Sequence, residues 1–102
     1  MRTKIASLHF KASETLKDFA QLEVGRLEKF TEDIIGCEIE FTFTKAQKEA
    51  HIHLNVDGTV LNALGASDDF MKSTVLAVDK LEQQLKKLKG KMQSKRAAGN
   101  GE

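Results

Sequence analysis

The chain has 102 residues, of which 40% are hydrophobic and 30% are charged, so it can bury one hydrophobic core but not two. No apolar run approaches the roughly 20 residues of a membrane span, and the N-terminus lacks the apolar core of a secretory signal. The single cysteine, Cys37, cannot form an internal disulfide, which fits a reducing compartment. We therefore expect a cytoplasmic protein with one domain at residues 1–95 and a flexible tail at residues 96–102.

The formal net charge of +1 conceals an asymmetry along the chain. Residues 1–79 hold nine Lys and Arg against thirteen Asp and Glu, whereas residues 80–102 hold seven against two. The positive charge is therefore gathered near the C-terminus.

The first 30 residues predict a strand followed by a helix. Residues 3–10 mix polar and apolar side chains around Ile5, as a short strand does. Ser13 can cap a helix that runs to about Lys29. The apolar positions of this helix keep to one face, and they are Leu16, Phe19, Ala20, Val24, Leu27 and Phe30.

Three strands are expected next. Residues 37–44 alternate strictly between apolar and polar side chains, and residues 50–56 do the same, which is typical of strands with one face in water. Asp57-Gly58 then predicts a two-residue hairpin turn. If Val56 faces Thr59 across this turn, Leu54 faces Leu61, and one sheet face stays apolar on both strands.

The stretch from Asp68 to Lys95 predicts one long helix. Ser67 or Asp68 can cap its first turn, and apolar residues recur at spacings of three and four, so they form one buried stripe. The stripe consists of Met71, Thr74, Val78, Leu81, Leu85, Leu88 and Met92.

The expected fold class is α+β, in the order β-α-β-β-β-α. Each helix has one apolar stripe and the sheet has one apolar face. The economical packing is a four-stranded sheet with both helices on one face.

The second helix also carries a row of cations. Lys80, Lys87 and Lys91 lie within about 40° of one another on a helical wheel, with Gln84 between them. Lys86 lies on the other flank and Lys89 lies nearer the core edge. Such a row suits the repeating phosphates of a nucleic acid. A solvated helix end that only confers solubility is about as common, but here few acidic residues are interleaved. Arg26 and Lys29 extend the row if their flank of the first helix faces the second.

Other chemistry finds little support in the sequence. His51 and His53 project on the same side of a strand, near Glu38 or Glu40, but polar residues on a wet sheet face need no metal. No catalytic triad, paired carboxylates or phosphate-binding loop is visible. We expect no enzymatic activity, no cofactor and no metal, and we expect Cys37 to be a small buried side chain.

These elements, with the Val56-Asp57-Gly58 hairpin and the run Asp79-Lys80-Leu81, Gln84-Leu85, Lys87, Lys89 and Lys91, resemble the bacterial ribosome hibernation promoting factor family, which includes ribosome-associated inhibitor A. The resemblance covers residues 3–92 and fits the short form of the family. It implies a fold similar to a double-stranded-RNA-binding domain. It also implies a translation inhibitor that binds the small ribosomal subunit where mRNA and tRNA lie. Arg26, Lys80, Lys87, Lys89 and Lys91 would meet ribosomal RNA phosphates, with Gln84 in the same surface.

The chain departs from the family pattern at Ser7, where a glycine is usual, and at Glu23, where a lysine is common. Glu38 and Glu40 make the open sheet face acidic, so the helices are the expected contact surface. Two alternatives remain open. The apolar stripe of the second helix could pair with a second copy as a coiled coil, or the domain could bind any RNA duplex without ribosomes. We expect the free protein to be a monomer.

Overall fold

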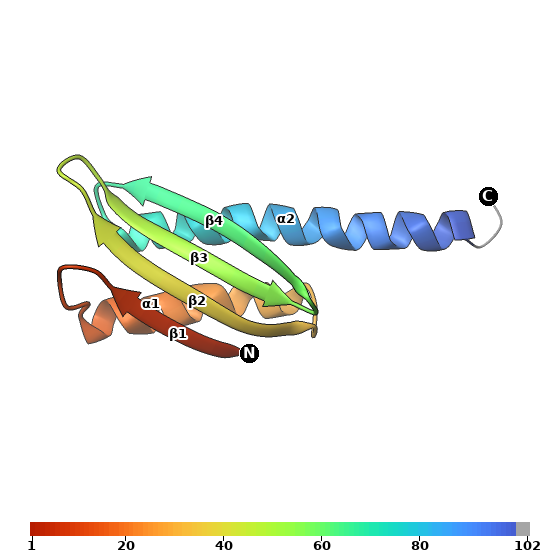
Figure 1. Ribbon diagram of the computed structural model, residues 1–102, viewed down its shortest axis with the longest axis horizontal. Coiled ribbons are helices and arrows are strands. Elements are labelled where there is room, and N and C mark those ends of the chain that lie inside the picture. The colour runs from red at the N-terminus through yellow and green to blue at the C-terminus, as the bar shows by residue number, and fades with distance from the viewer. Residues whose placement is uncertain (100–102) are drawn as a thin grey trace.

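The computed structural model describes the backbone of residues 1–99 and the side chains of residues 1–88. Its order of elements is the predicted β-α-β-β-β-α, with one additional short 3-10 helix (Figure 1). The elements are β1 (Arg2–Ser7), α1 (Glu14–Gly25), the 3-10 helix η1 (Arg26–Lys29), β2 (Ile34–Phe43), β3 (Lys48–Val56), β4 (Thr59–Ser67) and α2 (Phe70–Gly99).

The four strands form one mixed sheet in the order β1-β2-β3-β4. β1 runs parallel to β2, whereas β2, β3 and β4 are antiparallel neighbours. Asp57 and Gly58 have φ values of 43° and 85°, as the predicted hairpin turn requires. The predicted register is confirmed, since Val56 pairs with Thr59 and Leu54 with Leu61. β1 and β4 are therefore the two edges of the sheet.

Both helices pack on the same face of the sheet, as expected, and the core lies between the two layers (Figure 1). Leu16, Ala20, Val24 and Leu27 are buried on the side of α1 and η1. On α2 the predicted stripe is buried at Thr74, Val78, Leu81 and Leu85, and Met71 and Leu88 pack against its margin. The side chain of Met92 lies outside the described residues. The sheet contributes Cys37, Ile39, Phe41, Ala50, Ile52, Leu54 and Val56.

A glycine sets the spacing between α2 and β4. A Cβ atom on Gly65 would lie 1.9 Å from the backbone oxygen of Ser73 and 2.9 Å from the backbone nitrogen of Ala77. No side chain fits in that space, so the helix backbone rests directly on the strand. Ser73 is fully buried, and its hydroxyl donates a 2.6 Å hydrogen bond to the carbonyl of Lys48 on β3.

The observed ends of several elements differ from the predicted ones. The first helix changes to 3-10 geometry at Arg26, and the second begins at Phe70 because Asp69 caps it, accepting the N–H of Lys72 at 3.2 Å. β2 begins three residues early, at Ile34, where a register shift precedes Gly36. We expected residues 96–99 in the tail, but α2 continues through them. Ala97 and Ala98 are strong helix formers, which favours this extension. Residues 100–102 lie outside the described residues.

The C-terminal part of α2 projects beyond the sheet. Figure 1 shows α2 running along β4 and continuing past the β3–β4 hairpin. The molecule is accordingly elongated, at 54 × 25 × 18 Å. In the part of the chain that the structure describes, no helix is sufficiently long and apolar to cross a membrane.

Candidate nucleic-acid interface

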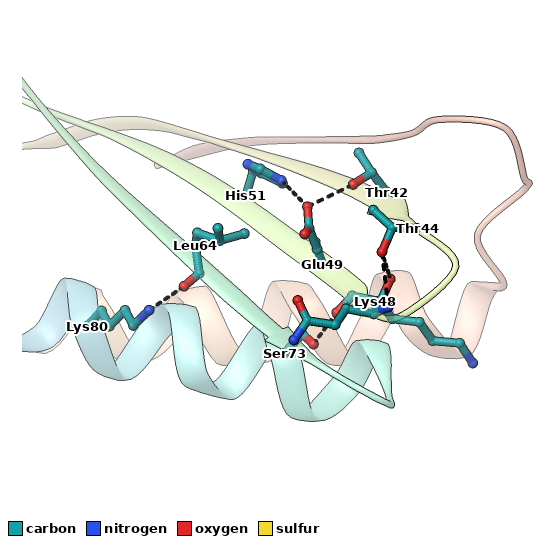
Figure 2. A network of polar contacts seen from close by, with 9 residues as sticks. Thr42, Thr44, Lys48, Glu49, His51, Leu64, Ser73 and Lys80 are labelled. Carbon is teal, nitrogen blue, oxygen red and sulfur yellow. Dashed lines mark hydrogen bonds and ion pairs between the residues drawn. The ribbon is translucent and has the colours of Figure 1, made fainter.

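Two residues of the predicted cationic row, Lys80 and Gln84, are hydrogen-bonded to the edge strand β4. Lys80 Nζ donates a 2.6 Å hydrogen bond to the carbonyl of Leu64, and Gln84 Nε2 donates a 2.7 Å bond to the carbonyl of Asn62. Figure 2 shows Lys80 reaching from α2 to the Leu64 carbonyl on β4. Both side chains therefore contact the sheet edge, which helical periodicity could not reveal.

The next turn of α2 carries further exposed cations. Lys87 is exposed and makes no hydrogen bond or ion pair with any other described residue. Lys86 is also exposed, and its Nζ lies 5.8 Å from the centre of the Phe30 ring, within the range of a cation–π contact. Lys29 is exposed on η1, beside Phe30. The side chains of Lys89 and Lys91 lie outside the described residues, although their backbone belongs to the projecting part of α2.

Arg26 lies in a cluster of carboxylates. Its guanidinium is 2.6 Å from Glu23 Oε1 and 3.2 Å from Asp79 Oδ1, and it also pairs with Glu82. The hydrogen bond that Arg26 donates to Glu23 raises the pKa of Arg26 most, and Asp79 and Glu82 on α2 raise it further, despite some opposing desolvation. One cation among three anions leaves local negative charge. The flank of η1 does face α2, as we supposed, but Arg26 joins the two helices there instead of extending a basic surface.

The open face of the sheet carries the two histidines. His51 Nε2 lies 3.0 Å from Glu49 Oε1, and His53 Nδ1 contacts Asn62 Oδ1. Figure 2 shows Glu49 between His51 and Thr42. Within the described residues no group of three or more His, Cys, Asp or Glu side chains is arranged to hold a metal ion. The histidines are therefore engaged in polar contacts along and between strands.

Cys37 is a core residue. Its side chain is 2% exposed, and burial, aided by the charge of Glu38, raises the pKa of the thiol to about 12. A thiol that stays protonated at neutral pH is a poor nucleophile and metal ligand. Cys37 is thus a packing residue, as expected.

The geometry defines a small α+β domain with an open sheet face and a projecting, lysine-rich helix. Residues 3–93 match the model of the Sigma 54 modulation protein / S30EA ribosomal protein family. The chain belongs to this family.

Known relatives agree with this assignment. The chain is 27% identical over 94 residues to the ribosome hibernation promoting factor of Pseudomonas putida, which covers 92% of each chain. It is 27% identical over 91 residues to the Azotobacter vinelandii protein of the same name, covering 89% of this chain and 85% of that one.

Solved structures agree as well. A ribosomal subunit interface protein from Coxiella burnetii superposes with a TM-score of 0.83 at 27% identity, over 88% of this chain and 99% of that one. The N-terminal domain of Thermus thermophilus Protein Y has the same fold, with a TM-score of 0.80 at 18% identity, over 86% of this chain and 99% of that domain.

Proposed function

We propose that this protein is a ribosome hibernation factor that binds the small ribosomal subunit and inhibits translation by occupying the region of mRNA and tRNA. Membership of the Sigma 54 modulation protein / S30EA ribosomal protein family supports the ribosome as partner. The names of the Pseudomonas putida and Azotobacter vinelandii relatives support hibernation.

The observation that carries the proposed mode of binding is the projecting half of α2. From Lys86 to Arg96 this half holds six Lys and Arg and no Asp or Glu. It extends beyond the β3–β4 hairpin (Figure 1), away from the carboxylates around Arg26. A cationic rod of this kind can enter between RNA strands and neutralise phosphates on more than one side.

The structure changes which residues we propose as contacts. Lys86, Lys87, Lys89 and Lys91, with Lys29 beside them, form the proposed RNA surface. Lys80 and Gln84 lie at its border with part of their donor capacity already used by β4. Arg26 is proposed to support this surface by joining the helices, because its guanidinium is held by three carboxylates.

The coiled-coil alternative loses its surface over most of the stripe. Thr74, Val78, Leu81 and Leu85 are buried against this chain's own sheet, so they cannot pair with a second helix without unpacking the core. The remaining alternative, a binder of any RNA duplex, is separated from ours by the experiment below.

The test measures binding of a Lys87→Gln, Lys89→Gln, Lys91→Gln triple variant to purified small subunits over a range of salt concentrations. Each phosphate that a lysine no longer neutralises should flatten the slope of log affinity against log salt by roughly one unit. We therefore expect a slope shallower by up to about three units, with weaker binding. A control with the same reduction in charge carries Lys4→Gln, Lys11→Gln and Lys45→Gln, all exposed positions outside α2, and should bind as the parent does.

Three results would contradict the proposal. Equally weakened binding in both triple variants would indicate a general effect of net charge. An unchanged slope in the α2 variant would place the RNA contact elsewhere. Binding to a free RNA duplex as tight as binding to small subunits would favour the general duplex binder.

A further inference from the structure

The free edge of β4 is unusually suited to pairing with another strand. β4 is nine residues long, and its sequence, TVLNALGAS, contains no charged residue and no proline. Two of its apolar side chains are exposed on the open face, Val60 at 57% and Leu64 at 40%. Soluble proteins usually protect such an edge with charged residues, proline, a bulge or a covering segment. The opposite edge follows this rule, since β1 carries Arg2 and Lys4.

The hydrogen-bonding groups on this edge can be identified from the hairpin register. In an antiparallel pair, alternate residues exchange both backbone bonds with the partner strand, and the others turn theirs outward. Val56 and Thr59 close the two-residue turn, so Thr59, Leu61, Ala63 and Gly65 bond to β3. Val60, Asn62, Leu64 and Ala66 therefore present their N–H and C=O groups to the free side, which we call the β4 edge.

Two side chains of α2 cap this edge. Lys80 donates to the Leu64 carbonyl at 2.6 Å and Gln84 donates to the Asn62 carbonyl at 2.7 Å. The spacing matches, because four residues rise about 6 Å along a helix and two residues span about 7 Å along a strand. The contact at Gly65 brings α2 sufficiently close for both side chains to reach.

We propose that the β4 edge is a latent pairing surface for a second copy of this chain, and that Lys80 and Gln84 hold it closed. An antiparallel pairing of two β4 strands, with Asn62 of each copy opposite Leu64 of the other, has two-fold symmetry. All four outward residues of each strand then find a partner, as in strand addition to a sheet edge. Each N–H and C=O on the β4 edge would be satisfied by the other copy.

The same arrangement explains why a lysine serves as one of the caps. In this pairing the symmetry axis passes beside Ala63, between Asn62 and Leu64, and neighbouring strands lie about 5 Å apart. The two Lys80 ammonium groups, each held at a Leu64 carbonyl, would approach one another across the axis. Lys80 therefore occupies an acceptor that a second strand needs and also repels the second copy. Leu76, which is 40% exposed one turn before Lys80, would gain apolar contact if the two copies did pair.

The test is the mass in solution of a Lys80→Met, Gln84→Met double variant, measured by light scattering after size exclusion over a range of concentrations. Removing both caps should shift the mass from 11.3 kDa toward twice that value as concentration rises, while the parent stays monomeric. The matched control is a Gln83→Met, Lys87→Met variant, which makes the same two replacements at exposed positions of the same helix and should stay monomeric. Adding Leu64→Lys to the double variant should restore the monomer by placing a charge on the strand.

Several outcomes would overturn the proposal. They are a folded double variant that stays at the monomer mass, dimerisation of the control to the same extent, and failure of Leu64→Lys to reverse the dimer. If circular dichroism shows that the double variant is unfolded, the same criteria apply to Lys80→Met alone, because this replacement frees the Leu64 carbonyl and removes the charge that repels the second copy. None of these readouts depends on ribosome binding, so they test the edge separately from the proposed function.

Discussion

Lys80 and Lys87 belong to the same helical row and have the same side chain, but only Lys80 is hydrogen-bonded to the sheet. Periodicity placed both on the polar side of the helix, which is correct, since both are exposed. It could not show that Lys80 lies against the carbonyl of Leu64, because that depends on how closely α2 packs on β4. Because Lys80 is hydrogen-bonded to the sheet, replacing it should lower the free energy of unfolding, whereas replacing Lys87 should not.

Arg26 illustrates the same limit at long range. Glu23, three residues earlier, is a partner that the sequence offers directly. Asp79 and Glu82 lie on another helix, 53 and 56 residues further along the chain. The sequence predicted that Arg26 extends the cationic row if its flank of the first helix faces the second. The flank does face α2, but the carboxylates on α2 that surround Arg26 are revealed only by the packing of η1 beside α2.

The buried thiol of Cys37 predicts a pH dependence. Its pKa is raised from 9.0 in the unfolded chain to about 12 in the native protein, so the native state holds the proton more tightly. The corresponding stability is fully present below pH 9 and is lost as the pH rises from 9 toward 12. At about pH 10 the free energy of unfolding should have fallen by about 1 kcal/mol from this cause.

Urea unfolding of the parent and of a Cys37→Ala variant, at about pH 7 and about pH 10, checks this expectation. The variant loses some stability from the change in packing, but its further decrease between the two pH values should be smaller than that of the parent. Equal decreases in both proteins would assign the alkaline instability to other groups.

At the scale of elements, local signals predicted the hairpin well and helix packing poorly. Asp57-Gly58 fixed the turn, and alternation then fixed which faces of β3 and β4 are apolar. Gly65 is also visible in the sequence, but the sequence does not show what packs against it. Its role as the contact point for Ser73 and Ala77 depends on two elements meeting, for which one sequence carries no local signal.

Gly65→Ala should therefore destabilise the fold by at least about 2 kcal/mol, because the added Cβ would meet helix backbone, which cannot rotate away as a side chain can. Gly25→Ala is the matched control. A Cβ there meets nothing closer than 4.0 Å, so the replacement should be neutral or stabilise the helix by up to about 1 kcal/mol. Denaturant unfolding measures both. Similar stability for the two variants would mean that α2 does not rest on β4 as closely as described.

At the scale of the whole molecule, the projecting helix makes the protein longer than its chain length suggests. The radius of gyration is 15.3 Å, whereas a compact domain of about 100 residues has about 13 Å. Small-angle X-ray scattering of the monomer should give a value near 15.3 Å, and a chain shortened after Leu88 should return to the compact range. A radius of gyration of about 13 Å for the full chain would mean that the end of α2 folds back on the body, which would remove the proposed RNA surface.

The contact at Gly65 also acts as the pivot of a lever. From Ala77, beside that contact, to Lys91 the helix rises about 21 Å, so a tilt of about 10° at the pivot moves Lys91 by about 4 Å. Such a movement exceeds the tolerance of a hydrogen bond, although no lysine has changed. Gly65, where the strand and helix backbones touch, therefore sets the direction of the cationic end of α2. Substitutions at Gly65 should therefore change the direction of α2 although they leave its lysines unchanged.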